Sequence, residues 1–296
     1  MRARAPGKLL LSGAYAVLEG APAMVLAVDR HAWAEGRSAQ APAEVRAALS
    51  DPPGVDTSAL EMDGRKLGLG SSAAGLVAAL ALRAAESGQD VRDAGVRAQL
   101  FAKAWAAHAE VQGGGSGVDI AASVYGGVSQ YRTGRPPEAV ALPSSLRFAV
   151  YFSGQSARTS ELRARVTSLS ARDPALHRRA MQALIELAER AAVAVTRPES
   201  DAGELVTVLQ GTAKGLAALG AAADAPIVPP AFAELGELAG HEASAFIPSG
   251  AGGGDVGVFV GTEGPSASFV QKAQQLGMKR LELAIDREGV VVLEAA

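Results

Sequence analysis

Residues 68–75 read Gly68-Leu69-Gly70-Ser71-Ser72-Ala73-Ala74-Gly75, and an Ala/Leu-rich segment follows them as far as Gly88. That segment is typical of a buried helix, and Ser71 or Ser72 is its natural N-cap. Glycines let the backbone approach a ligand closely, and a helix N-terminus offers free N–H groups with partial positive charge. The stretch therefore predicts an anion site, with phosphate as the first candidate. A capped helix with a tight entry turn is the alternative that these residues leave open.

The stretch is not a Walker A loop, because no Lys-Ser or Lys-Thr pair follows the glycines at the required spacing. A second glycine-rich stretch, Gly250-Ala251-Gly252-Gly253-Gly254-Asp255, precedes an apolar run. Glycine in regular structure costs about 0.5–1 kcal/mol relative to Ala. Close approach of the backbone to a ligand would explain that cost, and a flexible surface loop is the alternative.

Two charged residues are candidates for phosphoryl-transfer chemistry. Asp119 follows the glycine-rich turn Gly113-Gly114-Gly115-Ser116-Gly117 and opens a helix of small residues, which suits a general base and equally suits an N-cap. Lys8 lies at the start of an apolar run, and phosphoryl transfer needs positive charge near the transferred group. The alternative for Lys8 is a solvated side chain at a strand edge.

Apolar runs and helical spacing alternate along the chain. The pattern predicts strands at 8–12, 23–28, 146–152, 256–260 and 281–285, and helices at 44–49, 91–112, 159–168, 174–195, 202–219, 230–240 and 266–276. We expect Val290–Leu293 to close the last sheet. This mixture predicts an α+β architecture, and a composition shift near 132–143 predicts lobes at 1–143 and 144–296.

The composition excludes several classes of protein. The chain has 296 residues, 48% of them hydrophobic, with no Cys and a formal net charge of −3. Disulfides, thiol catalysis and Cys-bound metals are excluded. The chain also lacks the excess of basic residues that is typical of a protein that binds nucleic acid. No uninterrupted apolar run reaches the length of a membrane span, and the N-terminus lacks the features of a signal peptide. We expect a soluble, cytoplasmic protein without a membrane partner.

Three stretches together resemble the signature motifs of the GHMP kinase superfamily, in the family's order and over nearly the whole chain. They are Pro6-Gly7-Lys8-Leu9-Leu10-Leu11-Ser12-Gly13, Gly68-Leu69-Gly70-Ser71-Ser72-Ala73-Ala74 and Gly250-Ala251-Gly252-Gly253-Gly254-Asp255. Within the superfamily the phosphomevalonate kinases are most similar. Residues 107–122, which include Asp119, resemble that family's catalytic segment, and Ser156–Leu162 resembles its Ser-x-x-Thr turn.

The resemblance implies the two-lobe α+β fold of these kinases, with an N-terminal ATP-binding lobe and a C-terminal ferredoxin-like lobe. It implies an ATP- and Mg²⁺-dependent kinase of the mevalonate (isoprenoid) pathway that converts phosphomevalonate to mevalonate diphosphate. Asp119 would accept a proton or orient the acceptor, and Lys8 would stabilise the transferring phosphoryl group and interact with Asp119. The ATP phosphates would be bound by Gly68, Leu69, Gly70, Ser71, Ser72 and Ala73. The acceptor pocket would be bounded by Tyr15, Ser116, Gly117, Ser156, Thr159, Gly250, Ala251, Gly252 and Gly253.

The chain departs from the family pattern at its metal site. The resemblance implies that Ser72 holds Mg²⁺, but His108 stands where mevalonate kinases carry a Mg²⁺-binding Glu on the preceding helix. Glu110, two places away, is the predicted substitute. Many relatives also carry an acid where this chain has Ala14.

Two alternatives to phosphomevalonate kinase remain open. One is a GHMP kinase with an alcohol acceptor such as mevalonate or a sugar, and the other is a catalytically silent ligand sensor on the same fold. A phosphorylated acceptor needs positive charge, and the candidate cations are Lys8, Lys103 and Arg158. A homodimer is a further expectation.

Overall fold

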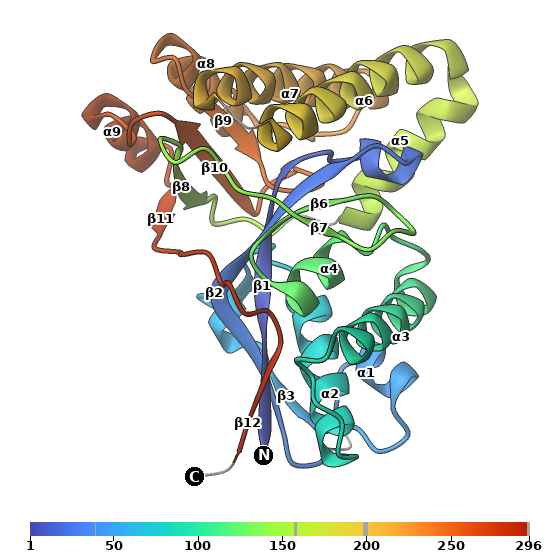
Figure 1. Cartoon of the computed structure of the whole chain (residues 1–296). Coiled ribbons are helices and arrows are strands. Elements are labelled where there is room, and N and C mark those ends of the chain that lie inside the picture. Colours follow the sequence, from blue (N-terminus) through green and yellow to red (C-terminus); the bar gives the residue numbers. More distant parts are fainter. Residues whose placement is uncertain (39, 157–158, 198–200, 295–296) are drawn as a thin grey trace. The chain divides into compact units, whose positions relative to one another are not determined.

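The computed structural model describes residues 1–38, 40–156, 159–197 and 201–294. The chain divides into two compact units, each of which contains helices and strands (Figure 1). The first unit comprises Met1–Leu9, Val25–Ala139 and Ala284–Ala296, and the second comprises Leu10–Met24 and Val140–Leu283. The predicted α+β architecture is confirmed.

Apart from a shift of the boundary from residue 143 to residue 139, this division differs from the predicted lobes in two segments. Residues 10–24 group with the second unit, and residues 284–296 group with the first. The chain therefore passes between the units more than once, which a single boundary near residue 143 does not describe. The physical reason is that strand partners far apart in sequence build each sheet, whereas a composition shift detects only a local change.

The first unit contains a six-stranded sheet with the order β12-β1-β2-β6-β7, and β3 pairs with β2. The strands are β1 (Arg2–Ser12), β2 (Ala23–Glu35), β3 (Gly54–Asp56), β6 (Val128–Tyr131), β7 (Glu138–Ala139) and β12 (Val291–Leu293). β12 is antiparallel to β1, with Leu293 opposite Arg2. The expectation that this C-terminal strand closes the last sheet is wrong, because three apolar residues carry no information about which edge they pair with.

Four helices lie together on one side of this sheet in Figure 1. They are α1 (Ala43–Ala48), α2 (Ser71–Glu86), α3 (Ala94–Gln112) and α4 (Val118–Tyr125). Residues 73–82 of α2 are buried without interruption, and α2 packs against α1, α3 and α4. Its many Ala side chains allow this close packing on several faces. A short hairpin of β4 (Glu61–Met62) and β5 (Arg65–Lys66), preceded by the 3₁₀ turn η2 (Ser58–Leu60), leads to the start of α2.

The second unit contains an antiparallel sheet with the order β11-β8-β10-β9. Its strands are β8 (Arg147–Phe152), β9 (Ala245–Pro248), β10 (Val256–Gly261) and β11 (Lys279–Leu281). Its helices are η1 (Ala16–Glu19), α5 (Thr159–Arg172), α6 (Pro174–Thr196), α7 (Ala202–Ala223), α8 (Pro230–His241) and α9 (Ala267–Gln275). A core of aromatic rings lies among these elements, formed by Tyr151, Phe232, Phe246, Phe259 and Phe269.

Helix α7 is long and apolar enough to cross a membrane by length and composition alone, with a mean hydropathy of 1.3 over its most apolar window. Glu204, Gln210 and Lys214 interrupt its apolar residues, so this helix does not contradict the expectation that no uninterrupted apolar run reaches the length of a membrane span. In the structure, α7 packs against α6, α8 and β9, and 44% of that window is buried. The core helix of a globular protein passes the same test of composition, so the test does not distinguish the two cases.

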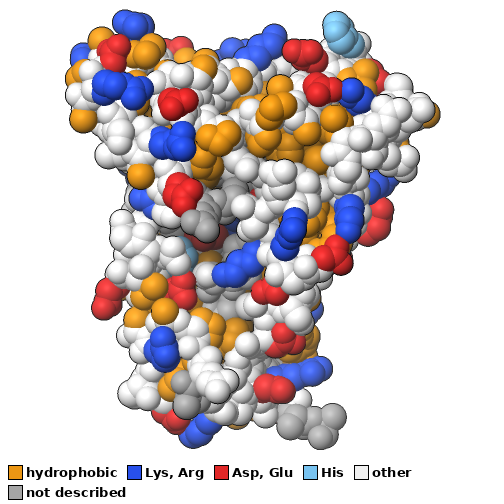
Figure 2. Space-filling model, turned by 180° about the vertical axis from the view of Figure 1, so that it is seen from behind, with side chains coloured by type: hydrophobic (Ala, Val, Ile, Leu, Met, Phe, Trp, Pro, Cys, Tyr) orange, Lys and Arg blue, Asp and Glu red, His pale blue; other side chains and the backbone are white. Residues whose placement is uncertain are grey.

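The surface carries charges of both signs. On the face drawn in Figure 2, Lys and Arg side chains lie interspersed with Asp and Glu side chains. The large hydrophobic side chains that are exposed are scattered along the chain, at Met1, Leu18, Val111, Val193 and Leu293. Single exposed hydrophobic side chains of this kind are ordinary on a protein surface.

Candidate active site

The glycine-rich loop before α2 ends in a left-handed turn. Gly70 is the N-cap of α2 with a φ of 78°, and no side chain caps the helix there. The predicted Ser cap is therefore wrong: Ser71 and Ser72 lie inside the first turn, because the turn at Gly70 already brings the chain into the helix. The amide of Ala74 donates to the carbonyl of Gly70 at 3.0 Å, which leaves the amides of residues 71–73 at the open end of the helix. This end is a phosphate-binding geometry.

Lys8 is hydrogen-bonded to this loop through both its backbone amide and its side chain. Its backbone amide donates to the carbonyl of Leu69 at 2.8 Å, and its Nζ donates to the carbonyl of Gly68 at 2.9 Å. The side chain is half-buried, so the alternative of a solvated strand-edge lysine does not hold. The structure places an ammonium group beside the open N-terminus of α2.

Asp119 meets the same loop from α4. A Cβ atom built on Gly70 would lie 3.2 Å from Cγ of Lys8 and 3.5 Å from Cβ of Asp119, so the three residues are in contact. The N-cap of α4 is Gly117, with a φ of 80°, and Asp119 is the second residue of the helix. The N-cap alternative for Asp119 is therefore wrong. Its Oδ1 accepts from the amide of Ile120 at 3.0 Å, and its side chain is 24% exposed.

Two aromatic residues hold the turn that leads into α4. Trp105 of α3 donates through Nε1 to the carbonyl of Gly115 at 3.2 Å, and the hydroxyl of Tyr131 donates to the carbonyl of Ser116. Both side chains press on Gly117, where an added Cβ would lie 3.1 Å from each. Burial raises the pKa of Tyr131 to about 12, so the hydroxyl keeps its proton and remains a donor. Sequence reasoning missed both residues, because a buried aromatic near a glycine turn looks like any core residue.

The metal-site prediction on α3 needs correction. His108 is half-buried, with Nε2 3.9 Å from Oδ2 of Asp119, whereas Glu110 is exposed. A residue two positions along an α-helix lies about 200° around its axis. Glu110 therefore points away from the side of α3 that faces Asp119. Among the described residues, no group of three or more His, Asp or Glu side chains forms a cluster that could hold a metal ion by itself.

A different carboxylate lies beside Ser72. Glu44 of α1 is only 6% exposed and accepts from Nε2 of Gln112 at 2.7 Å, and the hydroxyl of Ser72 lies near enough to its carboxylate to lower its pKa. Burial by itself raises the pKa of Glu44. The hydrogen bonds from its own amide, Gln112 and Ser72, together with the nearby charge of His108, lower the pKa by more than burial raises it, so the net shift is downward. The group is an ionised, buried carboxylate. Sequence reasoning predicted a helix here but had no signal for the burial of one acid.

The second unit brings Tyr15 to the other glycine-rich loop. Tyr15 is 6% exposed, and its hydroxyl donates to the carbonyl of Ala251 at 2.7 Å. Burial raises the pKa of Tyr15 well above its usual value. Ser249, next to the loop, accepts from the amide of Leu10 at 2.9 Å. Residues 10–24 and the loop are thus fastened together, as the predicted grouping of Tyr15 with Gly250 and Ala251 requires.

Two glycines of this loop, Gly252 and Gly254, allow close packing against other backbone of the protein. A Cβ on Gly252 would lie 1.9 Å from the carbonyl oxygen of Ile227, and the amide of Gly253 donates to that oxygen at 2.9 Å. A Cβ on Gly254 would lie 3.3 Å from the carbonyl oxygen of Gln155. Close approach to a ligand is therefore not needed to explain Gly252 and Gly254, because other backbone already occupies the space.

The predicted Ser-x-x-Thr turn lies next to this loop. The amide of Asp255 donates to the carbonyl of Gln155 at 2.8 Å, and Ser156 follows directly. Ser156 is exposed, and Thr159 is the exposed first residue of α5. Arg158, a predicted cation for the acceptor, lies outside the described residues.

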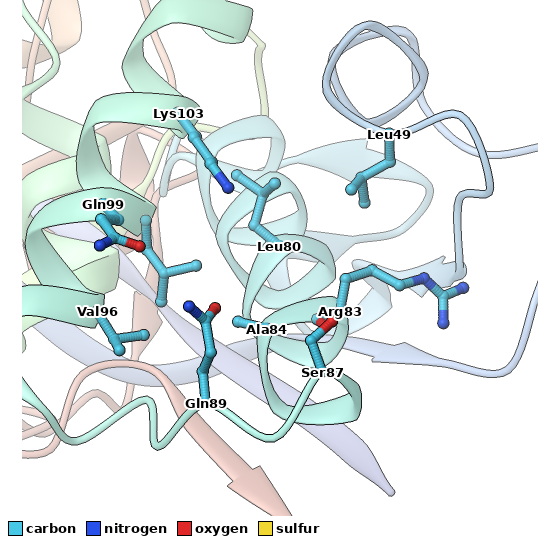
Figure 3. Close-up of a pocket in the computed structure, with 10 residues that line it drawn as sticks. Leu49, Leu80, Arg83, Ala84, Ser87, Gln89, Val96, Gln99 and Lys103 are labelled. Atoms are coloured by element: carbon cyan, nitrogen blue, oxygen red, sulfur yellow. The ribbon is translucent and has the colours of Figure 1, made fainter.

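Lys103, the remaining predicted cation, lines a separate cavity. The cavity has a volume of about 150 Å³ and is also lined by Leu80 and Arg83 of α2. Figure 3 shows the side chain of Lys103 directed toward Leu80. At a rise of 1.5 Å per residue, Leu80 is about 14 Å along α2 from Ser71. The structure therefore does not bring Lys103 together with Lys8 and Asp119.

The chain is similar in sequence or in fold to several kinases of small molecules. No protein-family model matches the chain. The phosphomevalonate kinase of Streptomyces sp. (strain CL190) is 27% identical, over 86% of this chain and 88% of that protein. The solved Lin0012 protein of Listeria innocua matches with a TM-score of 0.85 at 22% identity, covering 99% of each chain.

The phosphomevalonate kinase of Streptococcus pneumoniae, solved with phosphomevalonate and AMPPNP, matches with a TM-score of 0.80 at 18% identity, covering 96% of this chain and 99% of that one. Mevalonate kinase, homoserine kinase and galactokinase structures match with TM-scores of 0.63–0.73. The fold predicted from the three motifs is confirmed by these structures.

Proposed function

We propose that this chain, which has the fold of the GHMP kinases, transfers the γ-phosphate of ATP to a small molecule. The observation that carries the proposal is the contact of Lys8, Gly70 and Asp119 at the open N-terminus of α2. An anion site, a cation and a carboxylate in one place are what phosphoryl transfer requires, because its catalysis consists of positioning and charge stabilisation.

Each residue has a distinct role in this proposal. The amides of residues 71–73 and the dipole of α2 bind the ATP phosphates. Lys8 stabilises the negative charge of the transferring phosphoryl group. Asp119 orients the acceptor and takes its proton when the acceptor is an alcohol.

The residues present fit Mg²⁺. The hydroxyl of Ser72 lies in the first turn of α2, and oxygen atoms are the ligands that Mg²⁺ prefers, alongside substrate phosphates. Ser72 would hold the ion together with the phosphates. When bound, Mg²⁺ neutralises the charge that develops on the β- and γ-phosphates.

The proposed acceptor is phosphomevalonate, and the product mevalonate diphosphate. Support comes from the identity with the Streptomyces phosphomevalonate kinase and from the fold shared with the Streptococcus enzyme, whose structure contains phosphomevalonate. The second pKa of a phosphate group is about 6, so this acceptor is already a nucleophile at pH 7. Asp119 then acts mainly by positioning, beside the charge neutralisation that Lys8 provides.

An alcohol acceptor is the second candidate. Mevalonate kinase structures share the fold with TM-scores of 0.70 and 0.73. The structure also directs Lys103 into a separate cavity, which removes one of the cations expected to bind a phosphorylated acceptor. For such an acceptor Asp119 is the general base.

The test is release of ADP in a coupled assay with Mg²⁺ and ATP, with phosphomevalonate and mevalonate supplied separately. We expect turnover with phosphomevalonate and a loss of about 100-fold or more in kcat for Asp119→Ala, in the range of a positioned acid–base group. The matched control is Asp93→Ala, which removes the acid that caps α3 through the amides of Gly95 and Val96.

Three other outcomes would count against the proposal in different ways. Turnover with mevalonate alone would overturn the acceptor and keep the kinase. ATP binding without turnover on either compound or on sugar acceptors would favour a ligand sensor. Full activity in Asp119→Ala would remove the assignment of the site.

A further inference from the structure

Glu44 is a buried charge placed beside the proposed phosphate loop. Its side chain is 6% exposed and accepts from Nε2 of Gln112 at 2.7 Å, and its own amide and the hydroxyl of Ser72 are its further polar neighbours. Acidic side chains are rarely buried to this extent, because removing a carboxylate from water is costly unless partners compensate. A carboxylate kept at the first turn of α2 at that cost needs a reason beyond the packing of a six-residue helix.

The chemistry of the pair suits a small divalent cation. A carboxylate has about four acceptor positions, and Gln112 donates to Oε1. The hydroxyl oxygen of Ser72 and the carboxylate of Glu44 are neighbouring hard oxygen donors. Mg²⁺ is typically bound in proteins by one or two carboxylates together with substrate phosphates. The open N-terminus of α2 supplies the phosphate position next to the same serine.

We propose that Glu44 is the protein carboxylate that binds the active-site Mg²⁺ together with Ser72, an inference that rests on the proposed kinase function. The carboxylate then comes from α1, in the segment between the first two motifs, and not from α3. On α3 the residue facing Asp119 is His108, and Glu110 is exposed on another side of the helix.

A purely structural role is the competing explanation. Glu44 also joins α1 to α3 through Gln112 and to α2 through Ser72, and the three helices pack together. Substitutions separate the two roles because they change charge and shape independently. Glu44→Gln keeps the size and a hydrogen-bond acceptor but removes the charge, whereas Glu44→Asp keeps the charge and shortens the side chain. Glu110→Gln is the matched control, since it removes one exposed charge from the neighbouring helix.

The experiment measures metal binding directly. Mn²⁺ is titrated into the full chain with AMPPNP, and free Mn²⁺ is followed by electron paramagnetic resonance. We expect Glu44→Gln to weaken Mn²⁺ binding about 10-fold or more, the range seen when metal-site partners are removed. Its affinity for AMPPNP in EDTA should stay within about two-fold of the parent protein, because the loop amides and Lys8 are intact. Glu110→Gln should bind Mn²⁺ like the parent.

Each remaining outcome decides between the roles. Parental Mn²⁺ affinity in a folded Glu44→Gln protein, or a loss in Glu110→Gln, overturns the inference. If Glu44→Gln does not fold, Glu44→Asp is measured instead: weakened Mn²⁺ binding supports the inference, and parental binding with a lower melting temperature assigns Glu44 to structure. Failure of the parent protein to bind AMPPNP at all overturns the proposed kinase function itself, which is a separate result.

Discussion

Gly70 lies beside both Lys8 and Asp119 at the N-terminus of α2. Its φ of 78° lies in the left-handed region that glycine adopts without strain. The missing side chain matters as much as the backbone angle, because a Cβ would enter the space between Lys8 and Asp119. The close approach of Lys8 and Asp119 therefore requires a residue without a Cβ at position 70.

Gly70→Ala should abolish most activity while the protein remains folded. The left-handed conformation costs an alanine about 1–2 kcal/mol of stability. The contact of 3.2 Å with Cγ of Lys8 should also displace its side chain, so we expect kcat/KM to fall about 100-fold. Steady-state kinetics and thermal unfolding measure the two effects.

Gly88→Ala is the matched control for this substitution. Gly88 follows α2 with a φ of 81°, and a Cβ there would meet nothing within 4 Å. It should show the same loss of stability with unchanged kinetics. Equal kinetic losses in both variants would mean that backbone strain, and not the contact with Lys8, lowers activity.

At the scale of elements, Asp119 is positioned by the turn that precedes α4. That turn is held from two sides, by Trp105 on α3 and by Tyr131 on β6. The rings of Phe101 and Trp105 and of Phe101 and Tyr131 lie 6.0 and 6.1 Å apart, so the two holding residues belong to one aromatic cluster. The position of the carboxylate is thus set in part by residues on a helix and a strand outside α4.

Tyr131→Phe should lower kcat more than it lowers ATP binding. The substitution keeps the ring and removes the donor to the carbonyl of Ser116, which should cost about 1 kcal/mol of stability and loosen the turn before Asp119. We expect kcat to fall about 10-fold with KM for ATP within about two-fold, since misplacement of a reacting group acts on the chemical step.

Tyr125→Phe is the control for this prediction, because Tyr125 packs on Phe101 in the same cluster. It should leave kcat unchanged. A parallel rise in KM for ATP in Tyr131→Phe would instead indicate that the whole unit is disturbed.

At the scale of the whole molecule, the chain returns to its first unit at the C-terminal end. β12 pairs with β1, and the preceding turn is fastened by Asp286, whose Oδ2 lies 2.7 Å from Nε2 of His31. Its Oδ1 accepts from the amides of Glu288 and Gly289 at 2.9 and 2.8 Å. Burial by itself raises the pKa of Asp286. The hydrogen bonds from His31 and from the two amides lower the pKa by more than burial raises it, so its pKa lies below the usual range.

Asp286→Asn should destabilise the first unit in a way that depends on pH. A depressed folded-state pKa means that the unfolded chain takes up the proton first as the pH falls. The stabilisation is therefore complete above the ordinary Asp pKa of about 3.9 and is lost below it. At pH 7 we expect the free energy of unfolding to fall by about 1–3 kcal/mol, because buried donors lose the ionised acceptor to which they are bonded. The difference from the parent should shrink between pH 4 and pH 2.

Tryptophan fluorescence during urea unfolding reports this change, because Trp33 and Trp105, the two tryptophans of the chain, both lie in the first unit. Asp51→Asn is the control, since Asp51 forms an exposed pair with Arg37 and its loss should change stability by less than about 1 kcal/mol. A constant difference between parent and Asp286→Asn across the pH range would contradict the assigned shift.

The α+β class, the main helices and the glycine turn that opens α2 could all be predicted from the sequence. Local patterns determine these features: 3.6-residue periodicity in 174–195 and 202–219, apolar runs at 8–12 and 256–260, and glycines with hydroxyl residues before an apolar helix. The order of the three motifs was enough to predict the fold that the solved kinases share.

Only the tertiary structure decided where the remaining parts belong. The pairing of β12 with β1, the burial of Glu44 beside Ser72 and the outward position of Glu110 depend on which elements meet in space. Position 252 requires glycine because the carbonyl of Ile227, 25 positions earlier in the chain, fills the space that a Cβ would need. Periodicity reports the face of an element that is buried but not the partner that buries it, and for this reason the sequence determined the elements and the tertiary structure determined the site.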